Sequence, residues 1–351
     1  MFRPRLARIS GSLLLAIASL GASAMASAED VIRFGAPLPI TGPLAPEAVK
    51  QQMGYNLWAE EANKAGGINV GGKKYKMPTI AASASSSQVY DQGYKYLFGT
   101  FTPNDTLTTP LTGIVKAKAP DVKKIAILAR NDLFPLAIAQ EMEKSAKAVG
   151  LEVVYSEKYA INTLDHSATL SQIKSLAPQW VFITGYTNDL LLIRKQMVDQ
   201  QMKASVVTMI AGPAYQDFIE AAGQSAENIS SASWWHPAEQ YDGKDIFGKT
   251  SNFVRLFKAK YNSEPDYGQA SAAVSGALFQ LAIEKAGTLD RDKVRDALAS
   301  LDVMTFWGPV KFGANGQINS LEPPVFQIQN AKPVVLFPEA IKQGEFKLGV
   351  N

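Results

Sequence analysis

Short apolar runs alternate with amphipathic segments between residues 123 and 222, and this alternation predicts strands and helices in turn. The apolar runs predict strands at 125–129, 151–155, 180–184 and 206–210. The helical stripes between and after them are Ile138, Met142 and Ala146; Leu170, Ile173 and Leu176; Leu190, Ile193 and Met197; and Tyr215, Phe218 and Ile219. Strands that alternate with helices of this length form a parallel sheet, whose ligands bind beyond the carboxyl ends of the strands.

The chain before residue 123 shows the same two patterns less regularly. We expect strands at 31–40 and 78–82, with a helix between them that carries Val49, Met53 and Leu57 on one side. No long linker or repeat interrupts the sequence, so two lobes that share interleaved segments fit the pattern best.

The chain after residue 237 changes character toward its end. Residues 247–301 are predicted to be helical, with Asp290 as an N-cap. The segments 310–312, 325–328 and 333–337 are predicted to form β-structure. The sequence as a whole predicts an α/β protein.

The first 28 residues have the pattern of a secretory signal peptide. Arg3, Arg5 and Arg8 precede an apolar stretch at 12–20, and small residues follow up to Ala28. The alternative is a membrane anchor, but a spanning helix needs about 20 apolar residues and this stretch is shorter. We expect cleavage near Ala28 and export to the periplasm.

Composition and charge exclude several classes of protein. With 351 residues, 46% apolar and 19% charged, the chain is typical of a packed soluble protein of two domains. The absence of cysteine excludes a disulfide scaffold, a thiolate metal site, a cysteine nucleophile and a lipid anchor on an N-terminal cysteine. Removing the three leader arginines from the 35 basic residues leaves 32, which equals the number of acidic residues, so no nucleic-acid partner is expected.

The motif search predicts no catalytic residue, no metal site and no cofactor. His166 and His236 are the two histidines; we expect His166 at the surface or at a helix cap, and His236 at most in a pocket wall. No phosphate-binding glycine motif, spaced acid/base pair or G-x-S-x-G sequence is present.

Residues 81–87 (AASASSS) follow the predicted strand at 78–82 and precede a possible helical turn. Hydroxyls and free backbone N–H groups at such a junction can bind an anion such as a carboxylate. Serine is also a favoured helix cap, so a purely structural loop is the alternative.

Seven segments carry a resemblance that extends over nearly the whole chain after residue 28. They are 34–42 (FGAPLPITG), 63–68 (NKAGGI), 77–85 (MPTIAASAS), 93–100 (GYKYLFGT), 125–128, 150–159 (GLEVVYSEKY) and 323–328 (PPVFQI). In this order they resemble the periplasmic leucine/isoleucine/valine-binding protein family, the substrate-binding components of ABC importers. The resemblance implies a type I periplasmic binding fold, with two lobes of mostly parallel sheet and helices and a hinge that closes over the ligand.

The resemblance also implies a division of the chain and a binding site. Residues 29–122 and 238–322 would form one lobe, the N-lobe, and residues 123–237 and 323–351 the other, the C-lobe. The expected ligand-binding residues are Ser83, Ser85, Phe134, Tyr186, Tyr215 and Trp235. The expected partners are a small molecule (an amino acid, an amide or an aromatic carboxylate) and the membrane permease, and the protein is expected to be monomeric.

The sequence departs from the family at two places. The acidic residue that holds the ligand ammonium follows a Gly-Pro, but here Gly212-Pro213 is followed by Ala214, so the ligand is either an amino acid held differently or a neutral amide or aromatic carboxylate. Two βα units, roughly 45 residues, are expected to be missing between Lys76 and Met77, which would leave a truncated and less stable N-lobe.

Three alternatives to an importer component stay open. One is an enzyme on a similar framework, which the missing motifs disfavour. The second is a ligand-sensing receptor domain of the same fold, and the third is a truncated relative that binds weakly.

Overall fold

The computed structural model describes residues 32–68 and 78–350, and residues 32–38 form a part of the chain separate from residues 39–350. Residues 32–40 form neither helix nor strand, so the strand expected at 31–40 is wrong for the residues described. A strand needs a neighbour that satisfies its backbone hydrogen bonds, and this segment has no partner in the sheets of the described chain. The signal peptide lies outside the described residues and stays a prediction.

Seven strands form one sheet in the order β11-β10-β7-β6-β5-β3-β4. They are β3 (Lys124–Arg130), β4 (Glu152–Tyr159), β5 (Trp180–Thr184), β6 (Val206–Ile210), β7 (Ser230–Ala232), β10 (Val325–Gln329) and β11 (Lys332–Phe337). Strands β3 to β7 are parallel, whereas β10 is antiparallel to β7 and to β11. The four strands expected between residues 125 and 210, and the parallel α/β arrangement, are confirmed.

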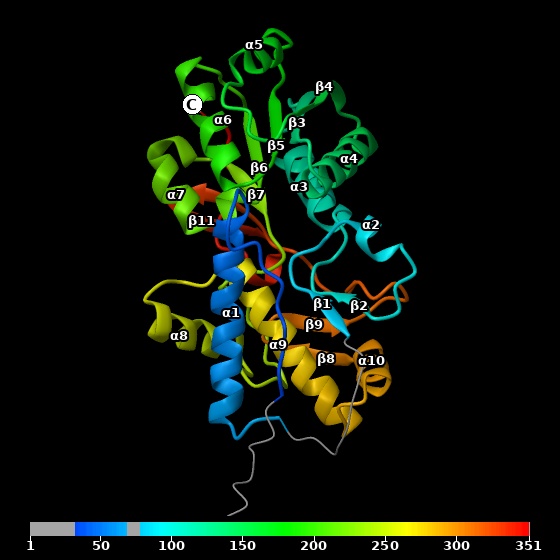
Figure 1. Ribbon diagram of the computed structural model, residues 1–351. Coiled ribbons are helices and arrows are strands. Elements are labelled where there is room, and N and C mark those ends of the chain that lie inside the picture. The colour runs from blue at the N-terminus through cyan, green and yellow to red at the C-terminus, as the bar shows by residue number, and fades with distance from the viewer. Residues whose placement is uncertain (1–31, 69–77, 351) are drawn as a thin grey trace, which may run out of the picture. The chain divides into compact units, whose positions relative to one another are not determined.

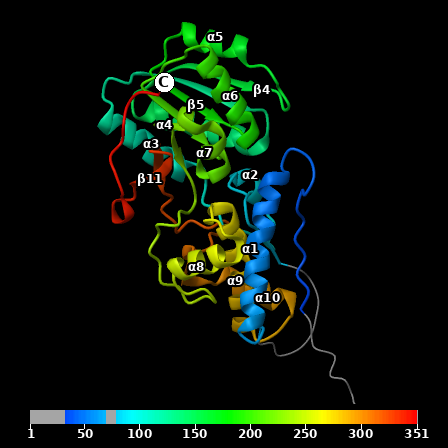
Figure 2. The same ribbon diagram turned by 90° about the vertical axis from the view of Figure 1, so that its left-hand side faces the viewer.

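Helices cover both faces of this sheet. Along β3, Ile125 and Ile127 belong to one apolar cluster, and Ala126 and Leu128 belong to another, because successive side chains of a strand point to opposite faces. The first face is covered by α3 (Asp105–Lys118) and α4 (Leu133–Ala148), and the second by α5 (Ser167–Ser175), α6 (Thr187–Asp199) and α7 (Gln216–Ala222). Figure 2 shows α6 and α7 in front of the sheet and α3 and α4 behind it. Helix α3 falls within the range expected for the N-lobe, yet it packs against α4 and the C-lobe sheet.

The N-lobe is built mainly from helices. They are α1 (Ala45–Lys64), α2 (Ser87–Tyr90), α8 (Thr250–Tyr261), α9 (Tyr267–Ala286) and α10 (Arg291–Ala299). Its strands are the parallel pair β1 (Thr79–Ala81) and β2 (Leu97–Gly99) and the antiparallel pair β8 (Asp302–Thr305) and β9 (Gly308–Lys311). The C-lobe segments also contain short 3₁₀ turns at η1 (Gly212–Ala214), η2 (Gly223–Ala226) and η3 (Glu339–Ile341). In the described ranges, no helix has the length and apolar character needed to cross a membrane.

The parallel sheet of the N-lobe has two strands among the residues described, β1 and β2. The junction at Lys76 and Met77, where the loss of two βα units is expected, lies outside the described residues. The truncation of the N-lobe therefore stays a prediction.

Helices α1 and α9 lie side by side, and glycines allow their close approach (Figure 1). A Cβ atom on Gly54 of α1 would collide with the backbone oxygen of Gln269 in α9. A Cβ atom on Gly276 of α9 would collide with the indole of Trp58 in α1. The close contact between α1 and α9 therefore requires glycine, which has no side chain, at positions 54 and 276.

We predict that Gly54→Ala destabilises the protein by about 1–3 kcal/mol, because an overpacked contact against backbone cannot relax cheaply. The matched control is Gly113→Ala in α3, where a Cβ atom would meet no atom within 4 Å. Alanine is the better helix former, so this control should stabilise by up to about 1 kcal/mol. Urea denaturation of both variants checks the prediction, and an equal gain in both would contradict it.

Candidate ligand-binding site

The carboxyl ends of β3 and β5 mark the point at which the strand order of the sheet reverses. From β3 the chain goes to β4 at one edge, then passes back across β3 to β5 and continues to β6 and β7. The helices that follow β3 and β5, α4 and α6, therefore cover opposite faces, and doubly wound sheets bind their ligands beyond the strand ends at such a reversal. The residues at these strand ends include Arg130, Phe134 and Tyr186.

Aromatic rings from both lobes gather beyond these strand ends. The ring centroid of Phe134 lies 6.3 Å from that of Tyr186 and 6.1 Å from that of Trp234. Trp234, just after β7, stacks on Phe101 with centroids 4.1 Å apart. Its ring also lies 5.6 Å from that of Tyr267, the first residue of α9. Because Phe101 follows β2, this cluster joins the C-lobe to the N-lobe.

A pair of tyrosines extends the cluster toward α1. Tyr215 Oη donates a hydrogen bond of 2.6 Å to Tyr267 Oη, and the two rings stack with centroids 5.2 Å apart. On Tyr215, Lys50 Nζ lies 3.8 Å from the ring centroid. An ammonium group at this distance is attracted by the negative face of the ring. The aromatic cluster therefore already accommodates one cation.

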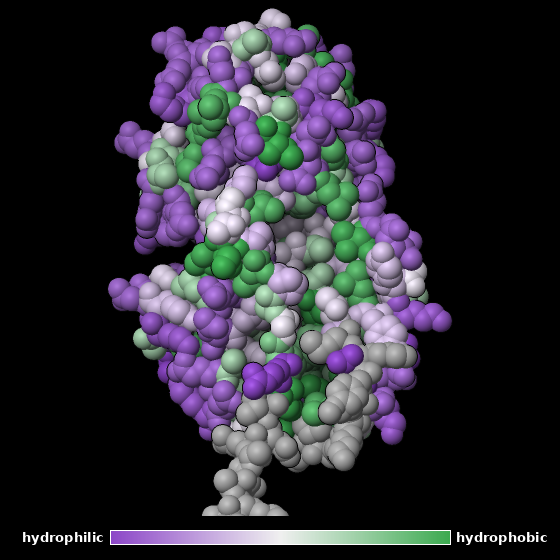
Figure 3. All heavy atoms as spheres, in the orientation of Figure 1, coloured by the Kyte–Doolittle hydropathy of each residue, from purple (hydrophilic) through white to green (hydrophobic). Residues whose placement is uncertain are grey.

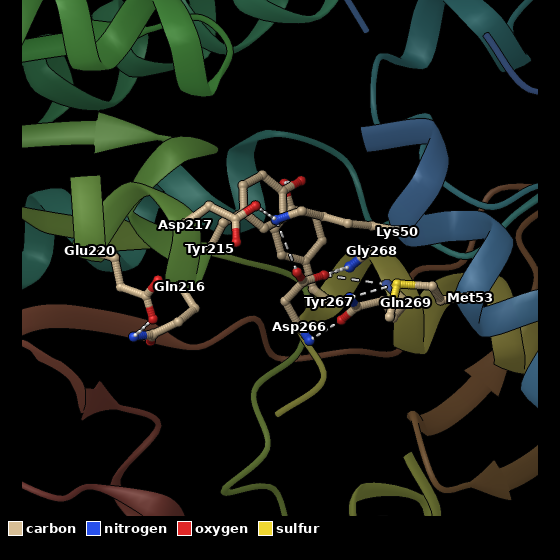
Figure 4. A network of polar contacts seen from close by, with 10 residues as sticks. All are labelled: Lys50, Met53, Tyr215, Gln216, Asp217, Glu220, Asp266, Tyr267, Gly268 and Gln269. Carbon is tan, nitrogen blue, oxygen red and sulfur yellow. Dashed lines mark hydrogen bonds and ion pairs between the residues drawn. The ribbon is translucent and has the colours of Figure 1, made fainter. Parts of the chain in front are cut away.

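Lys50 is held between two carboxylates, as Figure 4 shows. Its Nζ lies 3.2 Å from Asp217 Oδ2 and 3.4 Å from Asp266 Oδ2. The Lys50 and Asp266 side chains are each 12% exposed, whereas that of Asp217 is 69% exposed. Asp266 also caps α9 by accepting a hydrogen bond from the backbone N–H of Gly268. Burial raises the pKa of Asp266. The positive charge of Lys50 is the largest of the effects that lower this pKa.

A buried arginine lies at the end of β3. Arg130 Nη1 donates to Asp189 Oδ2 at 2.6 Å, and its Nε lies 3.7 Å from Asp132 Oδ2. The guanidinium carbon lies 4.9 Å from the centroid of the Tyr186 ring. Arg130 therefore fixes the position of that ring from one side.

The serine loop follows β1. Ser83 is exposed, whereas Ser85 and Ser86 are buried, at 2% and 4% exposure. The hydroxyls of Ser85 and Ser86 have no hydrogen-bond partner in the described chain. Gln317 Nε2 donates to the backbone oxygens of Ser85 and Phe101, and so ties this loop to the segment after β2.

The expected site residues do not all meet. Phe134 and Tyr186 are in ring contact, and Tyr215 is connected to them through Tyr267 and Trp234. Trp235 instead packs against Phe253 and Trp307, at 5.8 Å and 6.4 Å between centroids. The neighbouring Trp234 occupies the position in the cluster at which Trp235 was expected.

Other residues of the site were not identified from the sequence. They are Glu47, Lys50, Phe101, Trp234 and Tyr267. Phe101 and Trp234 follow strand ends, which is a signal that could have found them. His166 is the N-cap residue of α5, which confirms the helix-cap alternative, but it is buried at 1% exposure against the Tyr159 ring and does not lie at the surface.

The surface of the molecule is hollowed between the segments that Figure 1 labels α1 and α2, as Figure 3 shows in the same orientation. A second, shallow depression lies before β5 and β6, at the opposite edge of the sheet, and includes Gln179, Lys203 and Val350. The second depression is far from the aromatic and charged residues described above, so it does not belong to the same site.

One lobe is a doubly wound sheet, and its aromatic and charged side chains face a second lobe. This arrangement is that of a two-lobe binding protein of the type I periplasmic fold. The chain belongs to the periplasmic binding protein family, whose sequence profile matches residues 72–332.

Named relatives match nearly the full length of the chain. The "Leu/Ile/Val-binding protein homolog 8" of Brucella suis is 27% identical, over 98% of this chain and 100% of the relative. The leucine-, isoleucine-, valine-, threonine- and alanine-binding protein of Pseudomonas aeruginosa is 23% identical, over 90% and 94%.

Solved structures show the same fold. The branched-chain amino acid transporter substrate-binding protein of Streptococcus pneumoniae, in complex with isoleucine, has a TM-score of 0.72 at 21% identity, over 87% of this chain and 97% of the other. An ABC transporter solute-binding protein of R. palustris, in complex with benzoate, has a TM-score of 0.68 at 18% identity, over 89% and 95%.

The alignment with the Brucella relative is longer than this chain. The alignment extends over 406 positions, 55 more than the 351 residues present here. At least that many positions of the relative therefore have no counterpart in this chain. The alignment length does not locate these positions.

We predict that Lys50→Met destabilises the protein by roughly 3 kcal/mol, because it leaves the buried Asp266 carboxylate without its cation. Asp217→Asn, which removes the exposed partner of the same lysine, should cost less than about 1 kcal/mol. Chemical denaturation of the two variants measures both effects. Equal costs would show that Lys50 does not compensate Asp266.

The loss in Lys50→Met should also depend on pH. Without Lys50, the pKa of Asp266 rises further above its unfolded value, so the folded protein takes up a proton more readily than the unfolded chain. The penalty is then present at high pH and is relieved as the pH falls through the folded pKa. The difference in the free energy of unfolding between variant and wild type should be smaller near pH 5 than near pH 8. A larger difference at pH 5 would show that Asp266 is not the group whose charge Lys50 compensates.

Proposed function

We propose that this protein is the periplasmic solute-binding component of an ABC importer. It binds an amino acid or a related small carboxylate or amide between its lobes and delivers it to the membrane permease. Membership of the periplasmic binding protein family and the names of the relatives support this proposal. The family and the leader pattern at 1–28 support a periplasmic location.

The observation that carries the proposal is the buried Ser85 hydroxyl. It lies just beyond the carboxyl end of β1, is 2% exposed as a residue, and has no hydrogen-bond partner within the described ranges. A buried polar atom left unpaired costs about 1–3 kcal/mol, so native proteins rarely retain one without a reason. A ligand carboxylate that accepts this hydrogen bond would remove the cost.

The aromatic cluster would supply the apolar walls of the site. Phe134, Tyr186 and Trp234 come from three different strand ends of the C-lobe and present ring faces and edges of the size that small organic ligands contact. We include Trp234 in the proposed site in place of Trp235, and retain Ser83 and Tyr215 at its margins. Because Tyr215 Oη is engaged by Tyr267, its hydroxyl is less suited to a ligand than that of Tyr186.

The enzyme alternative has no supporting observation, because the sequence contains none of the motifs that would carry nucleophilic or phosphate chemistry. The receptor alternative shares the fold, but the two similar solved structures described above are named as transporter proteins.

We predict that Ser85→Ala and Tyr186→Ala each weaken ligand binding by roughly 10- to 100-fold, because a hydrogen bond to a charged carboxylate contributes about 1.5–3 kcal/mol. The compounds to titrate are amino acids, amides and aromatic acids, and isothermal calorimetry gives the affinities. Ser251→Ala, an exposed serine in α8, is the control and should bind as the wild type does. Unchanged affinity in both site variants would reject this site.

A further inference from the structure

Glu47 carries a carboxylate oxygen that no other described residue satisfies. The residue lies in the first turn of α1, and its Oε2 is buried with no hydrogen-bond partner in the part of the chain that the structure describes. The carboxylate accepts hydrogen bonds from its own backbone N–H and from the backbone of Thr187. Thr187 is the first residue of α6 and follows Tyr186, so Glu47 reaches from the N-lobe to the aromatic cluster.

Three buried tyrosines interact electrostatically with this carboxylate. The pKa of the Tyr186, Tyr215 and Tyr267 phenols is raised, by burial first and then by nearby charges that include Glu47 in each case. The Glu47 carboxylate therefore lies close to the rings at which the two lobes meet. Phenol rings next to a carboxylate form the environment that binds an organic cation, since both the ring faces and the oxygen attract positive charge.

The charges around Glu47 also favour a cation. Among the residues that the structure describes, ion pairs and electrostatic interactions connect two cations, Lys50 and Arg130, with five carboxylates: Glu47, Asp132, Asp189, Asp217 and Asp266. Both cations have ion-pair partners other than Glu47. Burial raises the pKa of Glu47, and it outweighs the hydrogen bonds and the influence of Lys50. Within the described chain, neither cation therefore forms an ion pair with Glu47, and its Oε2 has no hydrogen-bond partner.

We propose that Glu47 binds the ammonium group of the ligand, so that the ligand is an amino acid or another small carboxylate that carries an amine. This inference rests on the proposed function and narrows it, because it excludes neutral amides and simple aromatic acids as the preferred ligands. Position 214, at which an acidic residue was expected, is an alanine. Glu47 supplies the missing carboxylate from α1 instead.

A purely structural role for Glu47 is the competing explanation, since its hydrogen bond with Thr187 links α1 to the start of α6. The two roles make opposite predictions for stability without ligand. A structural link that is lost lowers the unfolding midpoint. An uncompensated carboxylate that is replaced by a neutral amide leaves the midpoint unchanged or raises it, because a raised folded pKa means that ionisation opposes folding at neutral pH.

The experiment compares ligands that differ only in the ammonium group. Calorimetry on the purified chain would use L-leucine against 4-methylpentanoate and L-phenylalanine against 3-phenylpropanoate. Wild type should prefer at least one amino acid over its deaminated partner by 10-fold or more. Glu47→Gln should lower that affinity by roughly 10- to 100-fold and remove the preference. Glu61→Gln, near the other end of α1 and paired with Lys64, is the control and should keep both.

The outcomes separate this inference from the proposed function. Equal binding of amino acids and deaminated acids by wild type overturns the role of Glu47 but leaves a carboxylate-binding protein. A preference that survives in Glu47→Gln, or a lowered unfolding midpoint of that variant with unchanged affinity, also overturns it. If no amino acid, amide or aromatic acid binds wild type, the proposed function fails together with this inference. The wild-type comparison needs no variant, so a misfolded Glu47→Gln protein would not prevent the test.

Discussion

Parallel strands end at one edge of a sheet, and the position of the candidate site depends on this constraint. The chain leaves β3, β5, β6 and β7 at the same edge, so residues 100 positions apart, Phe134 and Trp234, come into ring contact there. The strand order reverses between β3 and β5, the place at which doubly wound sheets bind ligands, and the N-lobe contributes Phe101 and Tyr267 to the ring cluster there.

A second feature is that charged groups are buried among these rings. A carboxylate in such surroundings is costly unless a cation or hydrogen bonds compensate it. Asp266 is compensated by Lys50 and by the N-terminus of α9, whereas Glu47 retains an oxygen with no partner in the described chain. Ligand-binding sites often retain unpaired buried polar groups, which destabilise the protein without ligand. A ligand that pairs with such a group removes this destabilisation, which adds to the affinity. The difference between Asp266 and Glu47 therefore separates a structural carboxylate from one that can serve a ligand.

The sequence predicted the C-lobe sheet well, because strands buried on both faces are continuous apolar runs such as 180–184 and 206–210. Helix α3 was not predicted, since Pro110 and its threonines obscure the apolar stripe at Leu107, Leu111 and Val115. The strand at 31–40 was predicted from its local apolar pattern, and no partner strand is present for it in the described chain. The pattern of apolar residues indicates which positions can be buried, but it does not show whether a neighbouring strand is present to form the backbone hydrogen bonds.

The site was predicted in part. Phe134, Tyr186 and Ser85 were expected from the family resemblance, which places each of them after the end of an apolar strand. Trp234 was missed in favour of Trp235 because β7 consists of small residues, so no alternation of apolar and polar positions indicated which tryptophan points to the site. Glu47 and Lys50 come from a helix whose contacts with the C-lobe depend on tertiary packing, and no local pattern reveals these contacts.

The central claim is that the ligand binds among the aromatic residues beyond the carboxyl ends of the C-lobe strands. A crystal structure of the protein with the tightest-binding compound from calorimetry tests it most directly. The account predicts a ligand in contact with Phe134, Tyr186 and Trp234, with its carboxylate accepting a hydrogen bond from Ser85. A ligand in the depression before β5 and β6, or in any position that leaves these rings untouched, would contradict it.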